Sequence, residues 1–230
     1  LIIFDKNIIM KKITILLLAI TFSTASYSQL TDANFQTAIN TCLSTNPEDG
    51  LCSDSEYGAM PDWDVSQITD MNNAFYEKTT FNGDISTWDT SNVTIMRSMF
   101  ENAYDFNQPL NDWDVSNVTD MYEMLANMSD FNQDLNSWDV SSVTDMGKMF
   151  KMSDIFNGDI SSWDVNSVTN MRSMFADADR FNQDIGNWEV SSVTDMSFMF
   201  DHANDFNQNL SGWCVTNITE EEVMPGFNSG

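Results

Sequence analysis

The sequence has few bases, a single histidine and no long apolar run, and each shortage excludes a class of function. The 230 residues contain 9 Lys+Arg against 35 Asp+Glu. This balance repels phosphate backbones and anionic lipid, so we expect no nucleic-acid partner. The catalytic signatures GxSxG, HExxH, the P-loop and CxxC are missing, and His202 alone is a poor candidate for a general base. Acids are plentiful but recur in every repeat, whereas a catalytic pair should break the pattern, so we expect no enzyme.

The apolar run near the N-terminus is too short to cross a membrane. It extends from Ile13 to Phe22, about ten residues, whereas a membrane span needs about 20. Because Lys11 and Lys12 precede it and small residues follow up to Ser28, the segment has the order of a secretory signal peptide. We therefore predict that residues 1–28 are an N-terminal extension and signal peptide, and that the mature chain is exported from the cytoplasm without a membrane span. Removing them takes away one acid and three bases, which leaves 34 acids, 6 bases and a net charge of −28.

The sequence repeats with a period of 25 residues. All seven tryptophans follow this period, at positions 63, 88, 113, 138, 163, 188 and 213. Columns of Phe-Asn and of methionine keep the same spacing. A single unit of this length cannot bury its own apolar residues, whereas stacked units cover one another. We predict an N-terminal cap over residues 29–60, a repeat region over 61–219, and a truncated or irregular C-terminal end over 220–230.

Within each unit the pattern predicts a short helix and a short extended segment. Val118, Met121, Met124, Leu125 and Met128 follow the 3- and 4-residue steps of an apolar helix face. In four units a polar residue stands three positions before an acid at the start of this face and resembles a capping box. The pairs are Asn117 with Asp120, Ser142 with Asp145, Ser192 with Asp195 and Asn217 with Glu220. The phrase FNQDL at 131–135 predicts an extended segment that stacks into a parallel sheet. The predicted fold is a right-handed α/β solenoid of about seven coils, with a parallel sheet along one face.

The repeated phrase resembles a known family. FNQDLNSWDVSSVTDMGKMF at 131–150 and FNQPLNDWDVSNVTDM at 106–121 are similar to the BspA-type leucine-rich-repeat surface proteins of bacteria. The resemblance covers about 160 residues. It implies a secreted or surface-attached leucine-rich-repeat solenoid used for adhesion and protein contacts, with no catalytic residues to transfer.

The cysteines lie at the two ends of the repeat region. Cys42 and Cys52 fall in the predicted cap, where Phe35, Ala38, Ile39 and Leu43 have helical spacing. Outside the cell we expect these two cysteines to form a disulfide, the alternative being two unpaired thiols. The resemblance implies a partner for Cys214 in a further C-terminal cap, which this sequence lacks. We therefore expect a truncated end, or an end capped in another way.

Three polar columns have both a structural and a functional interpretation. Stacking would place Asp89, Asp114, Asp139 and Asp164 in a row of like charges, which either accept turn N–H groups or hold calcium between coils. The threonine column at Thr69, Thr94 and every 25 residues onward suits structural hydrogen bonds better than an ice-binding row. The asparagine column at Asn82, Asn107 and onward resembles the asparagine ladder of leucine-rich repeats and predicts buried amides bonded to the next coil.

The positions that vary between coils are the candidates for ligand contact. They follow each predicted helix and comprise Tyr76, Lys78, Glu101, Lys151, Asp177, Asp201 and His202. Exposed loops also vary without function, and one sequence does not separate the two explanations. We expect a monomeric, non-catalytic scaffold without a cofactor that binds a protein or a surface glycan. The alternative is a calcium-stabilised structural module of a larger surface protein.

Overall fold

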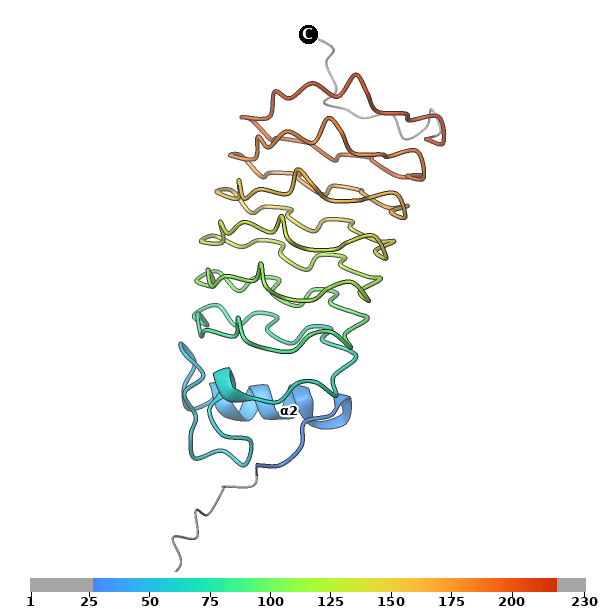
Figure 1. The fold of residues 1–230 in the computed structure, drawn as a ribbon. Helices are drawn as coiled ribbons and strands as arrows, with labels where there is room; N and C mark the ends of the chain where they lie inside the picture. Colours follow the sequence, from blue (N-terminus) through green and yellow to red (C-terminus); the bar gives the residue numbers. More distant parts are fainter. Residues whose placement is uncertain (1–26, 219–230) are drawn as a thin grey trace, which may run out of the picture.

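The computed structural model describes residues 27–218, a helical cap followed by a stack of coils (Figure 1). Helix α2, Asp32–Leu43, lies across the N-terminal end of the stack, and a 3-10 helix, Met60–Asp62, leads into the first coil. We number the coils from the tryptophan that opens each one, so the first coil is 63–87 and the sixth is 188–212. The predicted signal peptide, apart from its last two residues, and the predicted C-terminal end at 220–230 lie outside the described residues. Within 27–218, no helix is long and apolar enough to cross a membrane.

Helix α2 forms because its first turn is capped and its apolar residues share one side. The Thr31 N–H donates to the side-chain oxygen of Asn34 at 2.8 Å, and Asp32 adds a negative charge near the positive end of the helix. Phe35, Ala38 and Ile39, at the 3- and 4-residue steps of one helix face, are buried. The helix thereby covers the apolar end of the first coil.

The interior of the stack consists of files of equivalent side chains. The rings of Trp63 and Trp88 lie 6.2 Å apart and nearly parallel, and Phe156 and Phe181 stack at 6.1 Å. Burying one large apolar side chain contributes about 1.5–3 kcal/mol relative to leaving it exposed. Because equivalent side chains of successive coils cover one another, a change in coil length would break every file at once. The strict 25-residue period is therefore a packing requirement.

The predicted α/β fold is wrong. Within residues 27–218 the structure has one α-helix, α2, one 3-10 helix and no sheet. Parallel pairing between coils is limited to isolated bridges of one residue per coil, at Asp70, Ile95, Asp120, Asp145, Asn170 and Asp195. Neither the helix expected in each coil nor the sheet expected from stacked FNQDL segments is present. The coils are stacked, but not as a leucine-rich-repeat-like solenoid with a parallel sheet.

Linked turns take the place of the predicted helices. In the third coil the Met124 N–H bonds to the Met121 carbonyl three residues back at 3.1 Å, while the Glu123 N–H crosses to Gly147 of the next coil at 2.9 Å. N–H groups therefore bond alternately within the coil and to the next coil, which satisfies them without the i−4 bonds of an α-helix. These turns bury residues at 3- and 4-residue steps, as a helix would, which is why the apolar spacing predicted the wrong element.

The linked turns require left-handed backbone at two positions of each coil. Twelve non-glycine residues have φ between 49 and 64°, and they are Asn73, Glu77, Ser98, Asn102, Glu123, Asn127, Lys148, Met152, Ser173, Asp177, Phe198 and His202. A positive φ at the third residue of a four-residue turn is the geometry of a type II turn, which favours glycine or asparagine. The inter-coil hydrogen bonds and the core must therefore hold other residue types in this conformation.

The predicted capping boxes at 117–120, 142–145 and 192–195 do not start helices, and Glu220 of the fourth lies outside the described residues. The Asn117 amide donates to the Ser91 carbonyl of the preceding coil at 2.8 Å, and the Asp120 carboxylate accepts the Tyr122 N–H at 2.9 Å. The first bond joins two coils and the second closes a turn of the chain around an aspartate. The pattern of a polar residue followed by an acid therefore marked a turn supported by side chains, not the start of a helix.

The cap supplies the acceptors that a preceding coil would supply. The Asp32 carboxylate accepts the Thr69 N–H at 2.8 Å, the Thr69 hydroxyl at 2.7 Å and the Asp70 N–H at 3.2 Å. In later coils the same threonine groups bond to the threonine carbonyl 25 residues earlier. The Glu48 carbonyl likewise accepts the Asn82 N–H at 2.7 Å. The first coil is thereby closed by side-chain and loop oxygens.

Candidate binding surface

The bases and the large exposed apolar or aromatic side chains gather on one side of the stack, which we call the variable face. It comprises the exposed and half-buried residues of the segments 72–80, 97–105, 122–130, 147–155, 172–180 and 197–205, which stack in register. All six bases of residues 27–218 lie in these segments, at Lys78, Arg97, Lys148, Lys151, Arg172 and Arg180. So do the four large apolar or aromatic side chains that coils one to six expose, Tyr76, Tyr104, Met152 and Ile155. The rest of each coil carries recurring acids, amides and hydroxyls and no base.

Several bases of the variable face pair with acids on a neighbouring coil. The Arg97 Nε atom lies 3.0 Å from the Asp120 carboxylate, and the Lys148 Nζ atom lies 2.8 Å from the Glu123 carboxylate. Partly exposed pairs of this kind contribute about 0–1 kcal/mol each. They orient side chains across coils more than they stabilise the fold, and they leave no concentrated positive charge for an anion.

A cluster of cations and one aromatic ring occupies the middle of the variable face. The Arg97 guanidinium lies 4.3 Å from the centre of the Tyr122 ring, and the Lys148 Nζ atom lies 5.1 Å from it. A Cβ atom at Gly147 would come within 2.9 Å of the Tyr122 ring, so the missing side chain makes room for the tyrosine. Hydrogen bonds to Glu123 and then to Tyr122 raise the pKa of Lys148. The cluster joins coils two to four.

The seven predicted contact residues all lie on the variable face, but they do not form one cluster. The His202 Nδ1 atom lies 3.3 Å from Asp177 and 3.6 Å from Asp201 on the fifth and sixth coils. The other end of the face, next to α2, carries Tyr76 and Lys78. The structure places the remaining two, Glu101 and Lys151, on the second and fourth coils. A partner that touched all seven residues would have to lie along the stack.

Three carboxyl groups of the stack have a raised pKa. Burial is the largest cause for Glu101, Asp145 and Asp154, and the charges of neighbouring carboxylates add to it. Because the folded-state pKa is raised, these groups favour folding more when they are protonated. Acidification therefore relieves repulsion between coils at these positions.

An open cleft lies between α2 and the first coil, at one end of the variable face. Gln36 of α2 lines it together with Asn72, Asn73 and Tyr76, around a volume of about 670 Å³. The Gln36 side-chain N–H donates to the Ala74 carbonyl at 3.2 Å, which orients the amide. A hydrogen bond to Glu77, followed by the charge of that carboxylate, raises the pKa of the Tyr76 hydroxyl. The lining is thus aromatic and amide, without a charged side chain.

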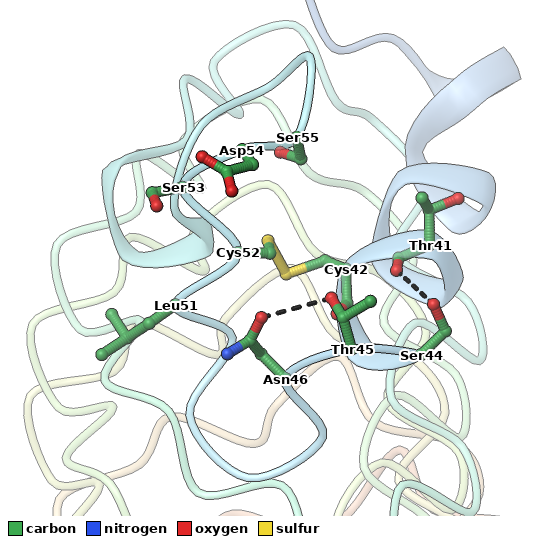
Figure 2. A pocket seen from close by; sticks show the side chains of 10 residues that line it. All are labelled: Thr41, Cys42, Ser44, Thr45, Asn46, Leu51, Cys52, Ser53, Asp54 and Ser55. Carbon is green, nitrogen blue, oxygen red and sulfur yellow. Dashed lines mark hydrogen bonds between the residues drawn. A yellow bond between two sulfur atoms is a disulfide. The ribbon is translucent and has the colours of Figure 1, made fainter.

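A second cleft, of about 510 Å³, lies beside a disulfide in the cap (Figure 2). Cys42 at the end of α2 and Cys52 in the following loop are joined there, with Cα atoms 5.3 Å apart. The Thr45 hydroxyl lies 3.0 Å from the Cys42 carbonyl and 3.2 Å from the Asn46 side-chain oxygen, and its one proton can bond to either acceptor. Because the Thr45 hydroxyl in the lining already bonds within the cap, we interpret this cleft as a structural feature of the cap and not as a ligand site.

The aspartates considered for calcium accept hydrogen bonds within their own turns. The Asp139 carboxylate accepts the Ser141 N–H at 3.1 Å and the Ser141 hydroxyl at 2.6 Å, and these two bonds lower the pKa of Asp139. Asp89, Asp114 and Asp164 accept equivalent N–H groups two residues on. Within residues 27–218, no three His, Cys, Asp or Glu side chains are grouped so as to hold a metal ion. This part of the chain therefore offers the calcium hypothesis no coordinating cluster.

The threonine and asparagine columns serve the stack. The Thr119 hydroxyl donates to the Thr94 carbonyl at 3.2 Å, and the Asn132 N–H donates to the Asn107 side-chain oxygen at 3.1 Å. The amides predicted to be buried are exposed or half-buried in every coil. Their oxygens still bind the next coil, because the stacking geometry and not burial positions the two partners.

Sequence reasoning missed the Tyr122 cluster and the cleft against α2. Both involve the ninth residue after the tryptophan, a column occupied by Asn72, Arg97, Tyr122, Gly147, Arg172 and Ser197. This column varies as strongly as the predicted contact positions do. The helix prediction placed this column inside an element and not on an exposed edge, so the column was not among the predicted contact positions.

Comparison with known proteins supports the repeat organisation. Comparison with curated proteins and with solved structures gives no match. One family matches twice, at residues 51–154 and 127–228, and the two matches together cover most of the sequence. Two matches along one chain are what an array of similar units should give. The chain therefore belongs to the family described as Mycoplasma protein of unknown function, DUF285.

Proposed function

We propose that the protein is an exported, non-catalytic scaffold that binds a protein or a glycan at the bacterial cell surface through its variable face. One observation carries the proposal: every base and every large exposed apolar side chain of coils one to six lies on this face. If exposed positions varied only for want of constraint, bases should also occur elsewhere around the coil. Extended repeat surfaces bind by area and shape, which agrees with the role implied by the BspA-type resemblance.

Within each coil, the residues that hold the fold together differ from the residues that form the variable face. Inter-coil hydrogen bonds and interior files hold the backbone, and the variable side chains contribute little to either. His202, the one histidine, has a side chain that is 72% exposed and lies beside two aspartates. Its position gives no support to a nucleophile activated by a buried base, and this favours binding over catalysis.

Paired variants test the proposal. The wild-type protein is screened against immobilised glycans and purified extracellular proteins, and any ligand found is measured by surface plasmon resonance. The double variant Lys151→Ser with Ile155→Ser changes the variable face. Its control, Asp112→Ser with Asn187→Ser, changes two exposed residues outside the variable face, at a position where two other coils already carry serine.

We expect the variable-face variant to bind about tenfold more weakly, as truncation of residues near the centre of an interface does, and the control to bind as wild type. Melting temperatures of both variants establish that each is folded. Equal weakening by the two variants would contradict the proposal, as would the absence of any ligand in both screens.

A further inference from the structure

We propose that the cleft between α2 and the first coil, lined by Gln36, Asn72, Asn73 and Tyr76, binds a neutral sugar unit. This inference rests on the proposed function, since it assigns the ligand class at one end of the variable face.

The lining is uncharged on a strongly acidic protein. Residues 29–230 carry 34 acids and 6 bases, yet the four lining side chains are one glutamine, two asparagines and one tyrosine. An uncharged lining offers nothing specific to an anion or to a metal ion. Amides present both N–H donors and carbonyl acceptors, which matches the hydroxyls of a sugar, each of which donates and accepts.

The amides of the cleft are available to a ligand. The Gln36 N–H group is used by the Ala74 carbonyl, which leaves its side-chain oxygen as an acceptor. Asn72 and Asn73 are exposed, and within residues 27–218 their side chains make no hydrogen bond to the protein. Three amide groups from two different elements therefore face one open space of about 670 Å³. This volume lies within the range of about 300–1,000 Å³ that small-ligand sites occupy.

The aromatic ring of the cleft is specific to the first coil. The column of Tyr76 continues as Glu101, Ala126, Lys151, Ala176 and Asp201, so no later coil places a ring at this position. The Tyr76 side chain is 36% exposed, and a partly exposed ring offers an apolar face with a polar tip. Such a face packs against the C–H face of a sugar while the amides bind the hydroxyls.

The cleft is held in place before a ligand arrives. The Tyr76 N–H bonds to the Asn73 carbonyl at 3.1 Å, and the Asn73 N–H bonds to Arg97 of the next coil at 3.0 Å. On the other side, Phe35 next to Gln36 is buried, and its ring lies 5.8 Å from that of Trp88. Because these walls are already ordered, binding a ligand costs less conformational entropy. A low ordering cost matters in an open cleft that offers only a few polar groups.

The test uses neutral hexasaccharides as probes. Maltohexaose, cellohexaose, laminarihexaose and mannohexaose are titrated separately into the protein, and binding is followed by calorimetry and by the side-chain amide signals in ¹⁵N NMR spectra. We expect at least one of them to bind and to shift the amide signals of Asn72 and Asn73. Tyr76→Ala should weaken its binding about tenfold, equivalent to about 1.4 kcal/mol.

Tyr104→Ala is the matched control. Tyr104 is 37% exposed, close to the value for Tyr76, and lies on the next coil outside the cleft. Unchanged binding by Tyr104→Ala, with both variants melting as wild type, supports the site. Equal weakening by both variants, no binding of any hexasaccharide, or binding of a peptide in the cleft instead would overturn it. If Tyr76→Ala leaves sugar binding intact while Lys151→Ser with Ile155→Ser abolishes ligand binding, the sugar site fails and the proposed function stands.

Discussion

At position 152, glycine should make this protein more stable than alanine does, although glycine usually weakens ordered structure. Met152 has φ of 59°, its N–H donates to the Ala176 carbonyl at 2.8 Å, and its side chain is 46% exposed. A non-glycine residue in left-handed backbone costs about 1–2 kcal/mol. Glycine gives back about 0.5–1 kcal/mol through the larger entropy of the unfolded chain. Met152→Gly should therefore be more stable than Met152→Ala by about 0.5–1 kcal/mol.

The assay compares urea midpoints of the glycine and alanine variants at two neighbouring sites. Ile155 is the control, because it is 43% exposed in the same coil and is not among the residues with positive φ. There the order should reverse, with Ile155→Gly less stable than Ile155→Ala by about 0.5–1 kcal/mol. If the alanine variant had the higher urea midpoint at both sites, the linked-turn description of the coil would be refuted. Because stacked repeats can unfold in parts, midpoints are compared only between variants of equal transition slope.

Three further predictions concern the cap and metal ions. Asp32→Ala should lower the unfolding free energy by about 1 kcal/mol near neutral pH, as the loss of a helix-cap acceptor does. Burial opposes ionisation of Asp32, but hydrogen bonds from Thr69 and Asp70 outweigh burial and lower the pKa of its carboxyl group. The difference in unfolding free energy between Asp32→Ala and wild type should therefore vanish as the pH falls below about 4. A difference that stays constant in urea titrations across pH would contradict this. Reduction of the Cys42–Cys52 disulfide, which spans 10 residues, should cost about 2–3 kcal/mol, measurable as a lower melting temperature with dithiothreitol and absent in the Cys42→Ala/Cys52→Ala variant. Chelation with EDTA should leave the melting temperature unchanged, and a fall reversed by calcium would show a metal site.

The periodic features of the fold were predictable, because packing imposes them directly on the sequence. The stacked rings of Trp63 and Trp88 follow from tryptophans spaced 25 residues apart, and the two family matches agree with a repeat. The apolar spacing from Phe35 to Leu43 marks α2, whose buried side it forms. Identical rings at one fixed spacing have a single favourable packing arrangement, which is the stack.

The path of the backbone within each coil was not predictable by the same means. Burial at Val118, Met121, Met124 and Leu125 is compatible with a helix and with linked turns, because both bring these residues to one side. What distinguishes them is the left-handed backbone at Glu123 and its counterparts. A glycine column would have revealed it, but the positions hold Asn, Ser, Glu, Lys, Met, Asp, Phe and His. Hydrogen bonds to the next coil decide the conformation, and no local propensity reports them.

The candidate surface was predictable in part, for a related reason. Variation along Tyr76, Glu101, Lys151 and Asp201 located one edge of the variable face from sequence alone. The cleft needs Gln36 and Asn72, which lie 36 residues apart and belong to different elements. Their proximity follows from how α2 closes the first coil. That arrangement depends on Asp32, whose carboxylate accepts the Thr69 N–H that in later coils bonds to the carbonyl of the preceding coil. No residue of the repeat has an equivalent role, so the repeat pattern does not predict it.

The tolerance of the left-handed positions explains how one backbone can present many surfaces. At Lys148 and Ser173 the same conformation is kept by side chains that share no chemistry, and in both the N–H group crosses to the next coil, so we attribute the conformation to these bonds. A side chain that the fold does not require is free to change. Interior residues such as Met124, fully buried between equivalent neighbours, have no such freedom. Variation is therefore tolerated on this side of the coil, which is the side of the proposed binding surface.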